Sequence, residues 1–172
     1  MPTPKQRFVA LDREVLLGWT LSIRPFMEAF AFFEKIKFFQ MVTPTTMAVV
    51  KDMERNGNDI QRHQATLIIQ AVLDSNIVRP PINETYRQVM DIHAEKLLET
   101  NVLRGGDKAD ALILVEASYL DAHVLLTTNK AIKSAQKDSL KVALLECGLE
   151  SIVILSPQEI VDYLARTKKP ET

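Results

Sequence analysis

The segment from Gly106 to Asn129 constrains the fold more than any other part of this sequence. It opens with Asp107 and Asp110, which are one helical turn apart, and continues as an almost wholly apolar helical stretch. A β-run follows and stops at Thr127-Thr128-Asn129. An apolar helix has to be buried, and buried helices do not usually begin with paired acids unless something stabilises the charge. The segment therefore predicts a buried helix that leads into a buried strand, with an acidic group at its start.

Short apolar runs alternate with helical patterns along the rest of the chain. Strands are expected at 7–12, 76–79, 124–127 and 151–155. Helices are expected at 14–22, 26–39, 44–56, 59–73, 84–99, 107–119 and 157–166, with one or two further helical pieces within 130–147. Apolar strands separated by helices are typical of a parallel sheet that is covered on both faces. We therefore predict a single α/β domain over residues 1–172, with about four or five parallel strands in a Rossmann-like three-layer arrangement. Residues 1–6 and 167–172 are expected to be flexible tails.

Composition narrows the possible classes of protein. The net charge of −1 leaves no overall electrostatic footprint for nucleic acid, so any such binding has to come from a local basic patch. The single cysteine, Cys147, excludes an intramolecular disulfide framework and a cysteine-rich zinc site. The first residues lack the apolar region of a secretory signal, so none is expected. No apolar run approaches the roughly 20 residues of a membrane span. We expect a cytoplasmic protein without a membrane segment.

The helix expected at 26–39 carries an unusual number of aromatic side chains. An apolar stripe at three- and four-residue spacing comprises Phe26, Phe30, Phe33 and Ile36. Three phenylalanines lie off this stripe, namely Phe32, Phe38 and Phe39. They either pack in the core or a lid, or form a surface for a partner such as a second copy of the chain. The sequence leaves both alternatives open.

Acidic and amide side chains stand at positions that a parallel sheet brings together. Asp12 ends the first strand, and Thr127 and Asn129 end another. Sites in open α/β sheets lie at the carboxyl ends of the strands, and Asp107 and Asp110 project from one face at a helix start. Such oxygen ligands suit Mg²⁺ or Mn²⁺, which can polarise a phosphoryl oxygen and activate a bound water. The constellation predicts a metal-dependent hydrolase that acts on phosphodiesters.

Each acid also has a purely structural interpretation. Asp107 is a good helix N-cap, and acids in a first helical turn gain about 0.3–1 kcal/mol from the helix dipole without any function. Asp12 could likewise cap the helix that follows it. Asp110 precedes solidly apolar sequence, so a charge that faces inward there needs a partner. Asp110 is therefore the acid for which a functional role is favoured most.

These motifs resemble the PIN-domain family of metal-dependent ribonucleases, which includes the toxins of many bacterial toxin–antitoxin pairs. The resemblance rests on three segments in the family's order, at residues 8–16, 110–129 and 154–159. The first is a strand that ends in Asp12, the second begins with Asp110-Ala111-Leu112-Ile113, and the third joins the last strand to the last helix. The resemblance implies RNA as the substrate and an antitoxin-like protein inhibitor as a possible partner.

The resemblance also implies roles for individual residues. Asp12 and Asp110 would be catalytic residues that bind Mg²⁺ or Mn²⁺. Asp107 would be an extra catalytic acid on the same face, and Asn129 would complete the catalytic set. Thr127 would lie beside Asn129 in the site and contact the substrate.

The sequence departs from the family pattern in its acidic residues. The family's second acid falls about where this chain has Val50. Glu54, one turn further along the same face, is the candidate replacement as a metal ligand, and Asp52 is less well placed. Asn129 is neutral where many family members have a carboxylate. These departures favour an alternative, in which the domain is a catalytically degenerate PIN-like module that binds RNA or protein.

Basic residues near these motifs are candidate contacts for RNA phosphates. Arg104 and Lys130 are the best placed, because they flank the acidic helix and the strand end. Others are Arg55, Arg62 and Lys133. A weaker resemblance to haloacid-dehalogenase-like phosphatases rests on residues 12–14 and 106–110, but that family requires an aspartate at the position of Glu14.

Overall fold

A four-stranded parallel sheet forms the centre of the computed structural model, which describes residues 6–167. The strands are β1 (Phe8–Leu11), β2 (Phe39–Met41), β3 (Ala122–Leu126) and β4 (Val153–Leu155), and they lie in the order β2-β1-β3-β4. The predicted parallel α/β architecture is confirmed. Apart from Gln6 and Thr167, the predicted flexible tails lie outside the described residues.

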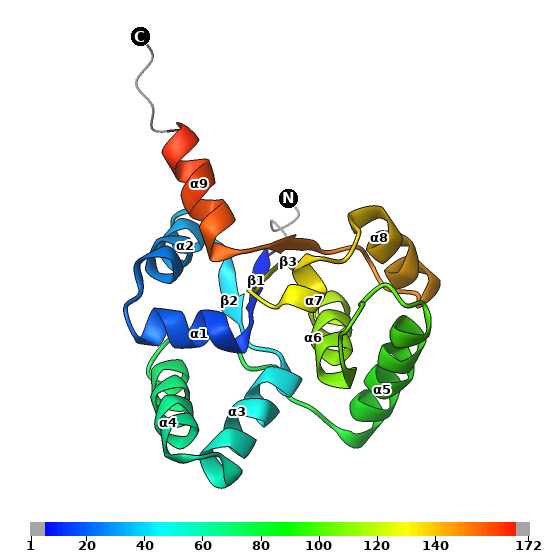
Figure 1. Cartoon of the computed structure of the whole chain (residues 1–172), viewed down its shortest axis with the longest axis horizontal. Helices are drawn as coiled ribbons and strands as arrows, with labels where there is room; N and C mark the ends of the chain where they lie inside the picture. The colour runs from blue at the N-terminus through cyan, green and yellow to red at the C-terminus, as the bar shows by residue number, and fades with distance from the viewer. Residues whose placement is uncertain (1–5, 168–172) are drawn as a thin grey trace, which may run out of the picture.

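Helices connect the strands and cover the sheet on both sides (Figure 1). They are α1 (Arg13–Thr20), α2 (Arg24–Lys35), α3 (Pro44–Asn56), α4 (Asp59–Leu73), α5 (Glu84–Glu99), α6 (Lys108–Tyr119), α7 (Lys130–Lys133), α8 (Lys137–Glu146) and α9 (Pro157–Thr167). Several begin at side-chain caps that the sequence predicts. Thr43, Asn83 and Asp107 each accept a hydrogen bond from a backbone N–H in the first turn of the helix that follows.

Alternating side chains of the strands belong to two separate hydrophobic clusters, one on each face of the sheet. On β1, Val9 and Leu11 belong to a cluster with helices α1 to α4, whereas Ala10 belongs to a cluster with α5, α6 and α8. On β3, Val124 and Leu126 face the first cluster, and Leu125 faces the second. Because successive strand residues point to opposite faces, this alternation produces the predicted three layers.

The prediction of one helix over residues 26–39 is wrong at its C-terminal end. Helix α2 ends at Lys35, and Lys37 adopts a left-handed conformation with φ of 63°. The Phe38 N–H donates to the Phe33 carbonyl oxygen at 2.9 Å, and the Lys37 N–H donates to the Glu34 carbonyl oxygen at 3.0 Å. This is a Schellman motif with lysine at the position where glycine is usual, so the sequence contains no obvious stop signal.

The chain after this motif forms the edge strand β2, which the sequence analysis missed. The strand expected at 76–79 is reduced to a single bridge between Met41 and Val78. The off-stripe aromatic residues pack largely within the molecule, since Phe32 lies edge-on to Phe33 and Tyr163 with ring centroids 5.2 and 6.1 Å apart. Phe39, by contrast, is 46% exposed.

No single helix among residues 6–167 is both long and apolar enough to cross a membrane. The helices α1 and α2 reach the required length and hydropathy only when they are taken together, and they meet at an angle of 101°.

Candidate active site

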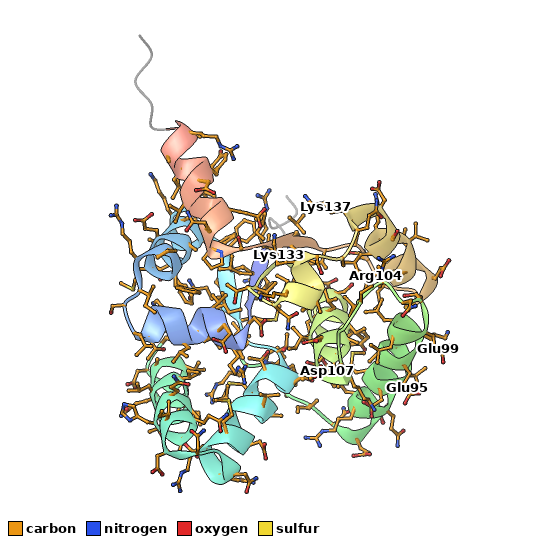
Figure 2. All side chains as sticks on the ribbon, viewed as in Figure 1. Glu95, Glu99, Arg104, Asp107, Lys133 and Lys137 are labelled. Atoms are coloured by element: carbon orange, nitrogen blue, oxygen red, sulfur yellow. The ribbon has the colours of Figure 1, made fainter. Side chains whose placement is uncertain are left out.

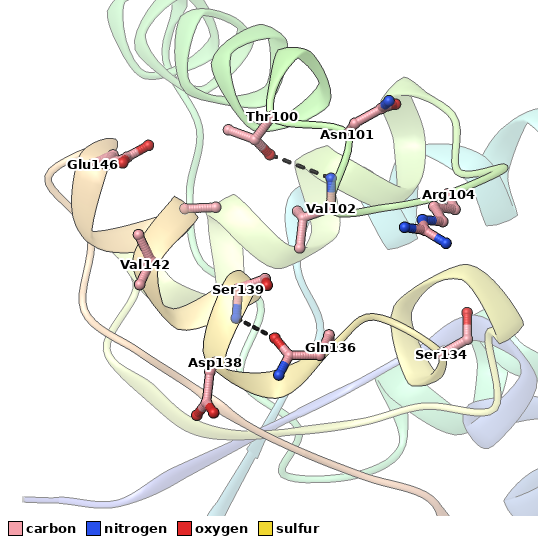
Figure 3. Close-up of a pocket in the computed structure, with 11 residues that line it drawn as sticks. Thr100, Asn101, Val102, Arg104, Ser134, Gln136, Asp138, Ser139, Val142 and Glu146 are labelled. Carbon is pink, nitrogen blue, oxygen red and sulfur yellow. Dashed lines mark hydrogen bonds between the residues drawn. The ribbon is translucent and has the colours of Figure 1, made fainter.

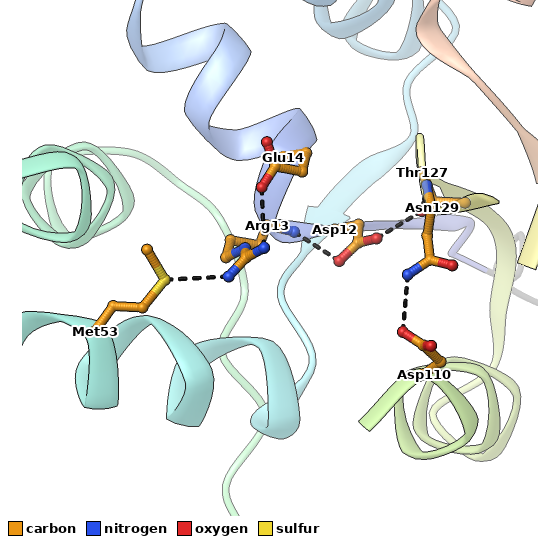
Figure 4. A network of polar contacts seen from close by, with 7 residues as sticks. All are labelled: Asp12, Arg13, Glu14, Met53, Asp110, Thr127 and Asn129. Carbon is orange, nitrogen blue, oxygen red and sulfur yellow. Dashed lines mark hydrogen bonds and ion pairs between the residues drawn. The ribbon is translucent and has the colours of Figure 1, made fainter. Parts of the chain in front are cut away.

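Asp12 and Thr127 meet at the carboxyl ends of two neighbouring strands, β1 and β3 (Figure 4). Asp12 is 7% exposed and Thr127 is fully buried. The Thr127 hydroxyl donates a hydrogen bond to Asp12 Oδ2 at 2.6 Å, and the Arg13 N–H donates to Asp12 Oδ1 at 2.7 Å. Both carboxylate oxygens of Asp12 are therefore held in fixed positions by neighbouring donors.

Asn129 continues this network towards helix α6. Its side-chain amide donates to Asp110 Oδ1 at 2.8 Å, and its backbone N–H donates to Thr127 Oγ1 at 3.0 Å. Asn129 Oδ1 accepts from the Ile132 N–H at 3.1 Å and so caps the short helix α7. A continuous chain of hydrogen bonds thus joins Asp12 to Asp110 through Thr127 and Asn129 (Figure 4).

Asp107 and Asp110 form a capping box at the start of α6. Asp107 Oδ1 accepts from the Asp110 N–H at 2.9 Å, and Asp110 Oδ2 accepts from the Asp107 N–H at 3.0 Å. This arrangement satisfies two backbone donors that a helix start otherwise leaves free. The structure therefore gives Asp107 the capping role that the sequence also allowed, while Asp110 takes part in both the cap and the network to Asp12.

The Asp110 carboxyl group is less readily ionised than a free one. Burial raises the pKa of Asp110, and the negative charges of Asp107 and Asp12 raise it further. The hydrogen bonds from the Asp107 backbone and the Asn129 side chain act in the opposite direction. Because repulsion among the carboxylates disfavours ionised Asp110, a cation placed between them would relieve the repulsion.

The donor set fits a hard divalent cation. Each ionised carboxylate offers about four lone-pair sites, and only one hydrogen bond is present on each oxygen of Asp12 and Asp110. Among residues 6–167, no group of three or more His, Cys, Asp or Glu side chains is arranged to hold a metal ion. Two carboxylates completed by waters and substrate phosphate oxygens are an ordinary arrangement for Mg²⁺.

Glu54 does not supply a third carboxylate. Val50 is fully buried in the cluster with α1 and α4, and Glu54, one turn further along α3, is exposed. Glu54 takes no part in the hydrogen bonds that join Asp12 to Asp110. Its expected role as a metal ligand is not supported, because α3 uses the side of Val50 for packing. Asp52 lines the groove beside the site instead.

The predicted phosphate contacts are spread over several elements. Arg104 is exposed on the loop before Asp107 (Figure 2). Lys130 is the first residue of α7 and directly follows Asn129. Arg104 also lines a polar cavity of about 1040 Å³ between this loop and α8 (Figure 3). Lys133 pairs with Glu159, and Arg62 pairs with Asp59, so both are already engaged. Arg55 is exposed on α3.

Glu116 is a polar residue of this region that the sequence analysis missed. It lies on α6 within the apolar stretch, and only 4% of it is exposed. Glu116 Oε1 accepts from the Thr45 N–H at 2.9 Å and so links α6 to the first turn of α3. Burial raises the pKa of its carboxyl group. An acid within the apolar stretch that follows Asp110 was the signal that could have identified it.

Comparison with known proteins supports the fold. No protein-family model matches the sequence, and no curated protein is significantly similar to it. One structural match is a chain from the crystal structure of VapBC2 from Rickettsia felis bound to a DNA fragment from their promoter. The TM-score is 0.59 at 10% sequence identity, over 87% of this chain and 98% of that chain. A second match is VapBC-1 from nontypeable Haemophilus influenzae, with a TM-score of 0.48 and 21% identity over 75% of this chain and 95% of that chain.

The first of these matches defines the class of fold. It spans nearly the whole of both chains, and at 10% identity it is a likeness of fold. The motifs indicated a resemblance to the PIN-domain family. This match, together with the sheet order and the position of Asp12 and Asp110, confirms that resemblance at the level of the fold. The chain has a PIN-like α/β fold.

Proposed function

We propose that this protein is a metal-dependent ribonuclease of the PIN type that hydrolyses RNA phosphodiesters. The observation that carries the proposal is the hydrogen-bonded chain from Asp12 through Thr127 and Asn129 to Asp110. It brings two carboxylates from distant parts of the sequence to the edge of the sheet where α/β proteins bind their ligands. The PIN-like fold supports the same assignment.

Asp12 and Asp110 would hold Mg²⁺ or Mn²⁺ in this proposal. The ion, when bound, would supply a polarised phosphoryl oxygen and a water of lowered pKa. Thr127 orients the Asp12 carboxylate, and Asn129 orients that of Asp110, so neither ligand has to be ordered when the ion arrives. Asp107 holds the first turn of α6 and thereby positions Asp110. Arg104 and Lys130 would contact the RNA backbone on either side.

A protein inhibitor and a second copy of the chain are further partners in this proposal. The Rickettsia felis match is a VapBC2 assembly bound to promoter DNA, and the motifs resemble those of toxin ribonucleases. A protein of antitoxin type that covers the acidic site is therefore a reasonable partner. The exposed apolar side chains Ile23, Met27 and Ile36 on and beside α2 are a candidate surface for homodimer formation.

The decisive experiment is a cleavage assay with Mn²⁺ titrated into protein that has been treated with a chelator. We expect cleavage of single-stranded RNA that depends on the metal and is lost in Asp110→Asn, because the amide retains the shape of the side chain but removes the ligand charge. Glu99→Gln, an exposed acid on α5, is the matched control and should cleave normally.

The outcomes separate this function from the alternative. If the Asp110→Asn variant still cleaves RNA, the assignment of the metal site is refuted. RNA binding without cleavage at any metal concentration would instead support the degenerate PIN-like module. That alternative is favoured because no group of three or more His, Cys, Asp or Glu side chains within residues 6–167 is arranged to hold a metal ion.

A further inference from the structure

A groove of about 690 Å³ is lined mainly by residues of helices α3, α5 and α6. Its lining includes Arg13, the residue directly after Asp12, and Glu116 on α6. Glu116 lies six residues after Asp110, which is about 9 Å along a helix at 1.5 Å per residue. The volume falls within the usual range for sites that bind small organic groups. A nucleotide next to the scissile phosphate could therefore reach this groove.

Glu116 differs from the other acids of the groove because it is buried. Asp91 lies 3.4 Å from the Lys108 ammonium, and Asp52 accepts from the Asn56 side chain at 2.8 Å. Within residues 6–167 no lysine, arginine or histidine pairs with Glu116, which accepts from the Thr45 N–H and has the Thr43 and Thr45 hydroxyl groups as further donors. A buried carboxylate is costly unless donors compensate for its lost hydration. The groove thus contains a strong acceptor with capacity for further N–H donors.

The walls of the groove suit a flat ring. Met53, Met90 and Leu112 line it with apolar side chains, and Arg87 is exposed at its margin. Unpaired bases of RNA are recognised by this combination of contacts to the ring faces and hydrogen bonds to the base edge. An arginine near the opening adds a partner for the phosphate.

We propose that this groove is a guanine-binding subsite, in which the Glu116 carboxylate accepts hydrogen bonds from the N1–H and the exocyclic amino group of the base. Guanine is the RNA base that presents two adjacent donors on its Watson–Crick edge, and they match the two oxygens of a carboxylate. Adenine and cytosine present one amino group beside a ring nitrogen acceptor, and uracil presents one N–H between two carbonyl groups. The inference rests on the proposed function, because it assumes that RNA is the polymer brought to the site.

The test is calorimetric binding of GMP, AMP, CMP and UMP to the full chain in a chelating buffer, which makes the readout independent of cleavage. We expect GMP to bind about tenfold or more tightly than the other three nucleotides. Glu116→Gln should remove this preference, because the amide replaces one acceptor with a donor that opposes those of guanine. Glu95→Gln, an exposed acid on α5, should retain it.

A second variant separates loss of binding from loss of folding. Val49→Trp fills the groove from the half-buried α3 wall and leaves Glu116 intact, so it should abolish GMP binding while the circular dichroism spectrum stays unchanged. Equal binding of the four nucleotides, no binding of any, or a GMP preference that survives Glu116→Gln would overturn the proposal. Binding of arginine amide in place of GMP would also overturn it and would assign the groove to a protein side chain.

Failure of this inference is distinguishable from failure of the proposed function. Polyuridylate contains no guanine, so its cleavage should be unaffected by Glu116→Gln and abolished by Asp110→Asn. An active enzyme without GMP preference refutes the subsite alone. A GMP-specific protein that does not cleave RNA refutes the ribonuclease function alone.

Discussion

Thr127→Val is the substitution that most directly tests how the acidic site is held together. Thr127 is fully buried, and its hydroxyl both donates to Asp12 Oδ2 at 2.6 Å and accepts from the Asn129 N–H at 3.0 Å. Valine has nearly the same shape but can do neither. The change therefore removes two hydrogen bonds from a buried site without creating a cavity.

The expected loss follows from these two contacts. A hydrogen bond to a charged group contributes about 1.5–3 kcal/mol, and leaving a buried donor unsatisfied costs about 1–3 kcal/mol. The added methyl group recovers roughly 0.8 kcal/mol of hydrophobic burial. We expect Thr127→Val to lower the free energy of unfolding by roughly 2–5 kcal/mol, and the Tm by about 4–20 °C for a chain of this size.

Urea unfolding followed by circular dichroism measures this loss, and Thr127→Ser is the matched control. Serine keeps the hydroxyl and loses one buried methyl group, so it should cost only about 1 kcal/mol. If Thr127→Val is no more destabilising than Thr127→Ser, the hydroxyl network does not hold Asp12 and Asn129 in place, and our reasoning about the site is refuted.

Two further predictions concern the other acids. Asp107→Ala should lower the free energy of unfolding by about 1 kcal/mol and Asp107→Ser by little, because serine retains a capping oxygen; equal losses in urea unfolding would contradict the capping role. Burial raises the pKa of Glu116 above its usual 4.5, so the folded protein binds this proton more tightly than the unfolded chain. That stabilisation is complete below about pH 4.5 and is lost as the pH rises through the higher folded pKa. Glu116→Gln should therefore gain in Tm relative to the wild type as the pH rises above about 4.5, and a difference in Tm that does not change with pH would refute the assignment.

Local sequence patterns predicted most of the fold. The caps at Thr43, Asn83 and Asp107 and the strand that ends at Asp12 depend on residues within a turn of each other, and the structure has each of them. The end of α2 was missed because Lys37 adopts a conformation that glycine usually signals. Edge strand β2 was missed with it, since Phe39 to Met41 continue an aromatic pattern that is equally compatible with a helix.

The acidic site was predicted only in part. The sequence placed Asp12, Asp110 and Asn129 at the ends of elements, where parallel strands bring side chains together. It did not reveal that Asn129 donates to Asp110 or that Glu54 stays outside the site, because both depend on how α6 and α3 are rotated against the sheet.

The sequence by itself determined most of the helices, three of the four strands, several of the caps and the strand ends where polar residues collect. These features follow from periodicity and capping, which act between residues a few positions apart. Only the tertiary structure decided that Thr127 bonds to Asp12 across 115 positions and that Glu116 bonds to Thr45 across 71. Such contacts depend on which faces of α3 and α6 are buried, and that is settled by the packing of the whole core against the sheet.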